Sequence, residues 1–422
     1  MNAPNPTTRL LLTEAQRLGL DLRSADLAVI GDPTGEIVAG LRSLGASRLR
    51  VHCDEITAER AVIAHLAAAG EKVRPAADGG TSPVVSEATT MAAAAADAAG
   101  AYPVTVYRRL DEALLAGVQL VVLALPKSLS ALREVAEVTA RHAAANVTVL
   151  GAGQVKHMTR TQNEVLAEWF KDVYATYGVG KSRGLVARGV RPEARRLRPT
   201  FPVWSVLAEP ELQSTTGLDH FTVVAHGGVF AGARLDLGTR ALLATASAWP
   251  RARRIVDLGC GTGILATVAA LRYPDSQVLA TDRSAAAIAS TVATAQANGV
   301  TAAQVDPAAS RSALGDLNGG RPEAAGTARV TAVRSDAGED IPSSSADLIL
   351  LNPPFHDRTE ISTAAAQAMF ATAARTLTPG GELWTVFNGH LPYRSILRRV
   401  VGPTGQVWHT PKFVVTRSTR VA

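Results

Sequence analysis

Short apolar runs alternate with helical patterns along this chain, and the alternation occurs twice. An apolar run of about four to eight residues is typical of a buried strand, and a repeated strand–helix order predicts a parallel sheet covered by helices on both faces. The predicted strands of the first series are Ala25–Gly31, Arg48–Asp54, Gln119–Pro126 and Asn146–Gly153, with helices at Thr57–Ala69 and Ser128–Ala145. Those of the second series are Arg254–Gly259, Ser276–Asp282, Arg329–Asp336, Ala346–Asn352, Gly381–Asn388 and Lys412–Ser418. We therefore predict an α/β fold with two tandem, doubly wound domains.

A basic segment separates the two series. Lys181–Arg198 contains seven basic residues against one acid, which equals the net charge of +6 for the whole chain of 422 residues. Because prolines also interrupt the strand–helix pattern here, we interpret it as an interdomain connection. The predicted division is a first domain over residues 1–183, a basic connector over residues 184–200 and a second domain over residues 201–422. Such a connector can follow a phosphate backbone, and a solvated arginine-rich linker is the alternative.

Composition excludes several classes of protein. With 47% hydrophobic and 19% charged residues the chain is typical of a globular protein. It has no run of about eighteen apolar residues, and its N-terminus lacks the basic-then-apolar layout of a secretion signal. Cys53 and Cys260 lie far apart in different motifs, so neither a disulfide framework nor a zinc cluster is indicated. We expect a cytoplasmic protein with no metal and no membrane contact.

A glycine-rich turn in the second series predicts a ligand site. Asp257–Gly263, DLGCGTG, follows a strand and opens a predicted helix at Ile264–Arg272. Glycines permit a tight turn, and the unpaired N–H groups of the helix face a ligand. Asp282 ends the next strand, where a carboxylate can accept the hydroxyls of a ribose, and Asp336 ends the third strand, within reach of an adenine. No phosphate-binding lysine follows the glycines, so a nucleoside without polyphosphate fits better than ATP, and NAD is the alternative.

The first series carries a weaker version of this turn. Gly31–Glu36, GDPTGE, has only two glycines, so we predict that the first domain is degenerate and binds no dinucleotide or cofactor. In the second series we interpret Val300–Thr327, rich in small residues, as a mobile loop. Met91–Ala101, rich in alanine, is predicted to form a helix or a surface insertion.

Phe221 to the C-terminus resembles the class I S-adenosylmethionine-dependent methyltransferases, whose domains are Rossmann-like. Gly227–Leu243 is similar to the segment that packs over the methionine end of the cofactor in one branch of that family. The resemblance implies S-adenosylmethionine as cofactor. The implied cofactor-binding residues are Phe230, Asp236, Gly238, Thr239, Asp257, Gly259, Cys260, Gly261, Gly263, Asp282, Arg283, Asp336, Ala337 and Asn352.

A second motif predicts the acceptor of the methyl group. A strand ends at Asn352, and Pro353, Pro354 and Phe355 follow, so that these four residues are candidate catalytic residues. An amine conjugated to a ring is a poor nucleophile because its lone pair is delocalised. If the Asn352 amide oxygen and the Pro353 carbonyl each accept one N–H, the lone pair is directed at the methyl group, and no strong base is needed. Phe355 offers a face on which a flipped-out base can stack.

The motif followed by His356 is similar to that of the ribosomal RNA guanine-N2 methyltransferases, the large-subunit group most closely and its small-subunit relatives next. Further similar segments are Phe387–Tyr393, Pro411–Ser418, Leu125–Val135 and Val147–Leu166. The resemblance implies methyl transfer to the N2 amine of a guanine in ribosomal RNA, with the large subunit favoured. We expect the second domain to perform the chemistry, the first domain with the basic connector to hold the RNA, and the enzyme to be a monomer. A glutamine-amide methyltransferase and an RNA-binding protein with an inactive methyltransferase half are the alternatives.

Four further side chains are candidates for contact with the substrate, each with a structural alternative. His390 and Tyr393 are candidates to line the acceptor groove, although core packing or surface exposure explains them as well. Lys127 and Lys156 are candidates for contact with phosphate groups.

Overall fold

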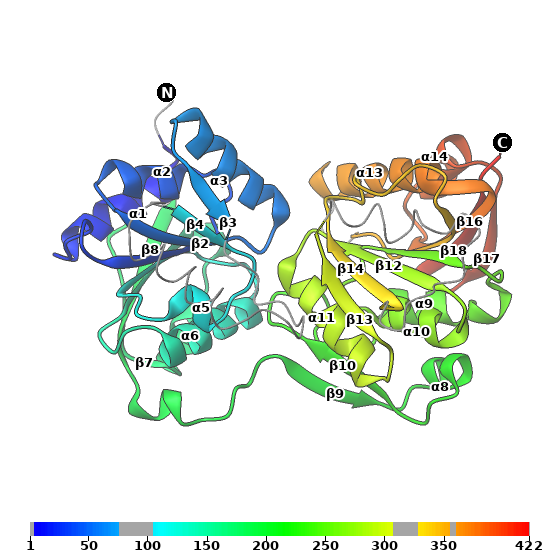
Figure 1. Ribbon diagram of the computed structural model, residues 1–422, viewed down its shortest axis with the longest axis horizontal. Coiled ribbons are helices and arrows are strands. Elements are labelled where there is room, and N and C mark those ends of the chain that lie inside the picture. The colour runs from blue at the N-terminus through cyan, green and yellow to red at the C-terminus, as the bar shows by residue number, and fades with distance from the viewer. Residues whose placement is uncertain (1–3, 76–103, 307–327, 355–359, 422) are drawn as a thin grey trace. The chain divides into compact units, whose positions relative to one another are not determined.

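The computed structural model describes residues 4–75, 104–306, 328–354 and 360–421. The chain divides into two compact units, Met1–Phe201 and Pro202–Ala422 (Figure 1). Each unit contains an eight-stranded sheet, and the second also has a two-stranded sheet. Helices lie against the eight-stranded sheets (Figure 1). No helix among the described residues is both long enough and apolar enough to cross a membrane.

The first unit holds the sheet β3-β4-β2-β1-β5-β6-β8-β7. Its strands are β1 (Asp26–Ile30), β2 (Arg48–His52), β3 (Val73–Pro75), β4 (Val104–Tyr107), β5 (Leu120–Ala124), β6 (Thr148–Gln154), β7 (Phe170–Ala175) and β8 (Ser182–Val190). Its helices are α1 (Pro6–Arg17), α2 (Glu36–Ser43), α3 (Ile56–Ala68), α5 (Glu112–Leu115), α6 (Leu129–His142), η1 (Val155–His157), α7 (Arg160–Ala167) and η2 (Pro192–Arg195).

The second unit holds the sheet β13-β14-β12-β11-β15-β16-β18-β17 and the separate pair β10-β9. The strands are β9 (Val203–Leu207), β10 (Phe221–Ala225), β11 (Arg254–Leu258), β12 (Gln277–Asp282), β13 (Ala302–Val305), β14 (Val330–Arg334), β15 (Ala346–Leu351), β16 (Leu377–Asn388), β17 (Thr404–His409) and β18 (Phe413–Thr419). The helices are α8 (Pro210–Thr216), α9 (Leu237–Leu243), η3 (Ala246–Ala248), α10 (Ile264–Arg272), α11 (Ala285–Ala297), α13 (Glu360–Thr376) and α14 (Tyr393–Val400).

The two large sheets have the same topology, strand for strand. In each, six neighbouring strands are parallel, and the last two strands in the order complete a mixed sheet, because β8 and β18 run antiparallel to both of their neighbours. The prediction of two tandem doubly wound domains is confirmed. The expectation of wholly parallel sheets was wrong at these ends, because a hairpin rather than a helix joins β7 to β8 and β17 to β18.

The first part of the predicted basic connector belongs to the first sheet. Residues 182–190 form β8, which pairs with β6 on one side and β7 on the other. Two arginines of the connector, which follow β8 in the chain, bind backbone carbonyls of the first unit. Arg191 Nε donates to Ala167 O at 2.8 Å, and an Arg195 terminal nitrogen donates to Ala143 O at 2.6 Å. These bonds satisfy carbonyls at helix ends, so part of the positive charge is structural.

The helix predicted at Ile264–Arg272 is confirmed as α10 with the same bounds. The loop predicted at Val300–Thr327 was wrong at its start, since Ala302–Val305 forms β13 and pairs with β14. Its residues 307–327 lie outside the described residues, as do Met91–Ala101.

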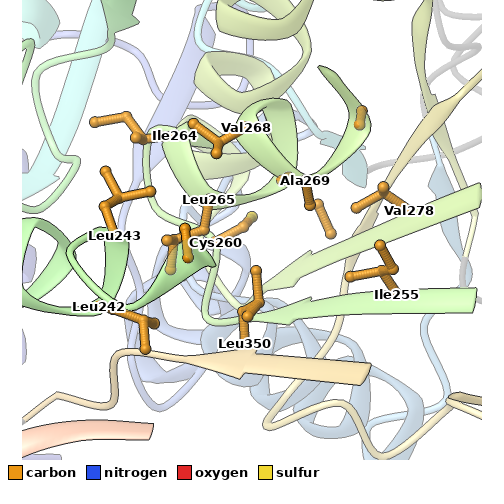
Figure 2. Packing of buried hydrophobic residues seen from close by; sticks show 14 of the residues in the cluster. Leu242, Leu243, Ile255, Cys260, Ile264, Leu265, Val268, Ala269, Val278 and Leu350 are labelled. Carbon is orange, nitrogen blue, oxygen red and sulfur yellow. The ribbon is translucent and has the colours of Figure 1, made fainter. Parts of the chain in front are cut away.

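A continuous apolar core holds α9 and α10 against the second sheet. Figure 2 shows Ile264, Leu265 and Val268 of α10 packed with Leu242 and Leu243 of α9, and with residues of the sheet below them. Those from the sheet are Ile255 of β11, Val278 of β12 and Leu350 of β15. Because burial of one such side chain stabilises the fold by about 1.5–3 kcal/mol, this core fixes the loops that leave the strands at its end.

Candidate active site

Three loops leave the second sheet at one edge. Leu258 at the end of β11 pairs with Thr281 of β12 on one side and with Leu351 of β15 on the other. The next residues along these strands are Gly259, Asp282 and Asn352. The strand order reverses between β12 and β15, and open sheets bind ligands at the carboxyl ends of strands beside such a reversal. The two motifs predicted from the sequence therefore lie at one edge.

The glycine turn is shaped by positive backbone dihedrals and by a threonine that the sequence analysis missed. Gly259, Gly261 and Gly263 have φ values of +81°, +54° and +77°, which other residues adopt only with strain. A side chain at Gly263 would lie 2.7 Å from Thr291 Cα of α11. Thr291 Oγ1 donates to Gly261 O at 3.2 Å and lies 3.2 Å from Cys260 Sγ. In the sequence, Thr291 could be noticed only as a small polar residue within an alanine-rich helix.

The turn suits a bound nucleoside. A side chain built at Gly261 would meet nothing within 4 Å, so its backbone faces open space that a ligand can approach. The Asp282 carboxylate accepts the Gly261 N–H at 3.1 Å and the Ser284 N–H at 3.0 Å, which holds it beside the glycine turn, where a carboxylate can accept ribose hydroxyls. The residues present therefore fit S-adenosylmethionine.

Asp257 lies behind the turn and not on its surface. Its carboxylate is 1% exposed and accepts the Ala266 N–H of α10 at 2.9 Å. Burial, with a smaller contribution from the nearby Asp282 carboxylate, raises the pKa of Asp257 to about 7. Burial also raises the pKa of the Cys260 thiol well above its usual range, so this thiol stays protonated. Both residues support the turn through packing.

The buried Asp257 predicts a pH-dependent stability. Its folded pKa is about 7 and an unfolded aspartate has about 3.9, so the folded chain binds the extra proton between these values. Raising the pH through this window therefore destabilises the fold, by up to about 4 kcal/mol from this group. Asp257→Asn removes the titrating group and leaves an acceptor for Ala266. We expect its thermal midpoint to fall less than that of the parent between pH 5 and pH 8.

The control is Asp219→Asn, which neutralises an exposed carboxylate of the same unit. Thermal unfolding of all three proteins across the pH range checks the expectation. Parallel curves for the parent and Asp257→Asn would contradict it.

Two residues that precede the glycine turn in the chain hold the Asn352 side chain. Its Nδ2 donates to Asp236 Oδ1 at 3.2 Å and to Thr239 Oγ1 at 3.1 Å. Since a carboxylate can only accept, this contact sets which side of the amide is nitrogen and leaves Oδ1 as the acceptor. Asp236 is also the N-cap of α9, accepting the N–H groups of Gly238 at 2.8 Å and Thr239 at 3.2 Å. Helix start and amide orientation thus depend on one carboxylate.

Gly238 permits this approach. A methyl group on its Cα would lie 2.9 Å from Asn352 Oδ1, 3.1 Å from Asn352 Nδ2 and 3.1 Å from Asp236 Oδ1. Real side chains almost never pack at such distances. Two exposed apolar side chains flank the segment, Phe230 with 52% and Leu237 with 57% of its surface exposed.

The remaining predicted residues have varied placements. Asp336 and Ala337 follow β14 at the same edge, and Ala337 has a strained φ of +48°. Arg283 is exposed, Pro353 is buried and Pro354 is exposed. Phe355 and His356 lie outside the described residues. Tyr393 is 2% exposed and packs edge-on against Phe370 and Phe387, so core packing explains this residue.

Sequence comparisons give two family matches along the chain: the Methyltransferase small domain over residues 220–318 and 311–417, and the RLMG N-terminal domain over residues 79–191. The ribosomal RNA large subunit methyltransferase G of Streptomyces coelicolor is 35% identical over 304 residues, which are 72% of this chain and 72% of that protein. The protein of the same name from Stutzerimonas stutzeri is 33% identical over 71% of this chain and 70% of its own length. This chain belongs to the ribosomal RNA large subunit methyltransferase G family.

A solved structure supports the fold of this methyltransferase G family member. A T. thermophilus 16S rRNA N2 methyltransferase, in complex with AdoMet and guanosine, matches 99% of this chain and 92% of its own with a TM-score of 0.66. Its sequence identity is 18%, so the match supports the tandem α/β fold only.

In the first unit, the corresponding edge of the eight-stranded sheet carries different residues. The loop after β1 spans residues 31–35 and is as long as the glycine turn after β11, and the buried Asp32 within it accepts the N–H groups of Gly35 and Val38, each at 2.9 Å. The Asp32 carboxylate thus occupies the loop itself and binds the start of α2, whereas in the second unit the start of α10 is bound by Asp257 of β11 and the loop carries Cys260 and glycines. After β5, Leu125 stands where β15 is followed by Asn352. These differences support a first unit without methyl-transfer chemistry.

Within the described part of the chain, no group of three or more His, Cys, Asp or Glu side chains is arranged to hold a metal ion.

Proposed function

We propose that this enzyme transfers the methyl group of S-adenosylmethionine to the N2 amine of a guanine in large-subunit ribosomal RNA. Membership in the methyltransferase G family supports the reaction, and its relatives are named for this RNA. One structural observation carries the acceptor assignment: Asp236 holds the nitrogen of the Asn352 amide, so that Oδ1 is presented as a hydrogen-bond acceptor beside the glycine turn.

An acceptor oxygen at this position suits an exocyclic amine. Guanine N2 carries two N–H groups and a lone pair delocalised into the ring. When Asn352 Oδ1 accepts one N–H, the nitrogen is held in one orientation and its lone pair turns out of the ring plane. Negative charge on Asp236 polarises the amide and makes Oδ1 a stronger acceptor. Alignment of this kind supplies up to roughly 7–11 kcal/mol in ideal cases.

S-adenosylmethionine, when bound, supplies an electrophilic methyl group on a positively charged sulfur. Gly259, Gly261 and Asp282 would hold its nucleoside part, and Asp336 would lie near its base. The enzyme's own residues orient the acceptor and do not need to remove a proton first. The N–CH₃ bond would form as the S–CH₃ bond breaks, leaving S-adenosylhomocysteine, and the methylated amine would then release its extra proton to water. We further infer that the enzyme is a cytoplasmic monomer and that Phe355 stacks on the target base.

The decisive experiment compares acceptors. Purified enzyme and labelled S-adenosylmethionine are incubated with protein-free large-subunit RNA, small-subunit RNA and a mixture of glutamine-containing ribosomal proteins. We expect label in N2-methylguanosine of the large-subunit RNA after nuclease digestion. Label in protein, or in a nucleoside other than N2-methylguanosine, would overturn the proposal.

A further inference from the structure

The hairpin that joins β7 to β8 presents an exposed aromatic side chain at the edge of the first unit. Tyr177 is 87% exposed, and Tyr174, near the end of β7, is 45% exposed. A single exposed ring needs no explanation in a folded protein. These rings, however, lie on an ordered hairpin, and its residues 174–183 and the adjoining segment 155–160 carry only basic charges.

Hydrogen bonds hold the hairpin in one shape. Thr176 is 7% exposed, its N–H donates to Gly184 O at 2.9 Å, and its Oγ1 accepts the Gly184 N–H at 3.1 Å. Val179 and Ser182 bind each other through both of their backbone groups, at 3.0 Å and 3.1 Å. Gly180, with φ of +58°, supplies the turn between them. The rings are therefore presented at little entropic cost on binding.

Positive charge surrounds this tip. The Val155 N–H donates to Lys181 O at 2.9 Å, which joins η1 to the hairpin. The segments 155–160 and 174–183 contain Lys156, Arg160, Lys181 and Arg183, all exposed, and no acidic residue. Arg183 Nε donates to Thr176 O at 3.3 Å, which holds this guanidinium against the hairpin.

We propose that this tip surface, formed by Lys156, Tyr174, Tyr177, Lys181 and Arg183, binds single-stranded ribosomal RNA. Its exposed cations can neutralise phosphate groups, and Tyr177 offers a face on which an unpaired base stacks. Aromatic and basic side chains together favour RNA over an acidic protein, because only the RNA uses both. The inference deepens the proposed function, on which it rests for the identity of the RNA. All residues of the tip surface precede the basic connector predicted over residues 184–200, so the inference places RNA contact before that connector.

The test measures binding of the full-length enzyme to protein-free large-subunit RNA at several salt concentrations. Tyr177→Ala should weaken binding roughly 10-fold, since a stacked base contributes about that factor. In the double variant Lys156→Gln/Lys181→Gln, the slope of log affinity against log salt should become shallower by about 1.5. Both variants should raise KM for RNA with kcat, S-adenosylmethionine affinity and thermal midpoint unchanged.

Matched controls separate this surface from general charge and aromatic effects. Lys72→Gln removes an exposed lysine just before β3, at the amino edge of the same sheet, and Trp204→Ala removes a ring that is 62% exposed on β9. Both controls should bind RNA as the parent does. Parent-like affinity and salt slope in the tip variants would overturn the inference, as would equal losses in the controls.

The outcome for the tip surface is distinguishable from that for the reaction. If the enzyme methylates guanine N2 and the tip variants bind RNA like the parent, only the surface is wrong. If the tip variants lose RNA binding while the parent methylates another nucleoside, the surface is supported and only the reaction assignment fails.

Discussion

Asn352→Ala is expected to lower kcat for methyl transfer about 10³-fold while changing the affinity for S-adenosylmethionine by no more than a few-fold. The variant removes the Oδ1 acceptor that would hold the guanine amine, whereas the glycine turn and Asp282 are untouched. Single-turnover transfer to ribosomal RNA measures the first quantity, and calorimetric titration of the cofactor measures the second.

Asn352→Asp is a second test of the same role, because it keeps the shape of the side chain and replaces the nitrogen that faces Asp236. Two carboxylates about 3 Å apart repel each other, so one of them takes up a proton or moves. We expect transfer to be lost at neutral pH in this variant as well. Loss of cofactor affinity in parallel with transfer, in both variants, would contradict the assigned role of Asn352.

Gly238→Ala is expected to lower kcat about 100-fold without destabilising the fold. Its methyl group would lie 2.9 Å from Asn352 Oδ1, so the amide must move, and a displacement near 1 Å costs a factor of this size. Gly238 is the second residue of α9 and has no positive φ, so alanine suits the helix better than glycine by up to about 1 kcal/mol. Stability and activity therefore change in opposite directions.

Gly405→Ala provides the matched control for Gly238→Ala. Gly405 lies on β17 without a positive φ, and a side chain there meets nothing within 4 Å. This variant should transfer methyl groups at the parent rate. Thermal unfolding and steady-state kinetics of the three proteins check both statements, and a Gly238→Ala enzyme with parent kcat would show that the amide position is not critical.

The local pattern of apolar residues predicted strands correctly where those strands are buried. The apolar runs around Asp257 and before Asn352 are buried on both faces, so their composition alone predicted β11 and β15. It was a poor guide at the ends of the sheets. Residues 182–190 include a buried run at 184–187, but arginines lie on both sides of it, and their charge suggested a connector. Whether such a segment pairs with a sheet depends on neighbours that lie far away in the sequence.

The sequence by itself determined the strand–helix order, the glycine turn and the placement of Asn352 at the end of a strand, because each follows from short-range residue pattern. Only the tertiary structure decided how the Asn352 amide is oriented. Asp236 lies 116 residues earlier in the chain and is also the N-cap of α9. Contacts between distant segments decide whether the oxygen or the nitrogen of the Asn352 amide faces Asp236, and no local pattern encodes such a contact.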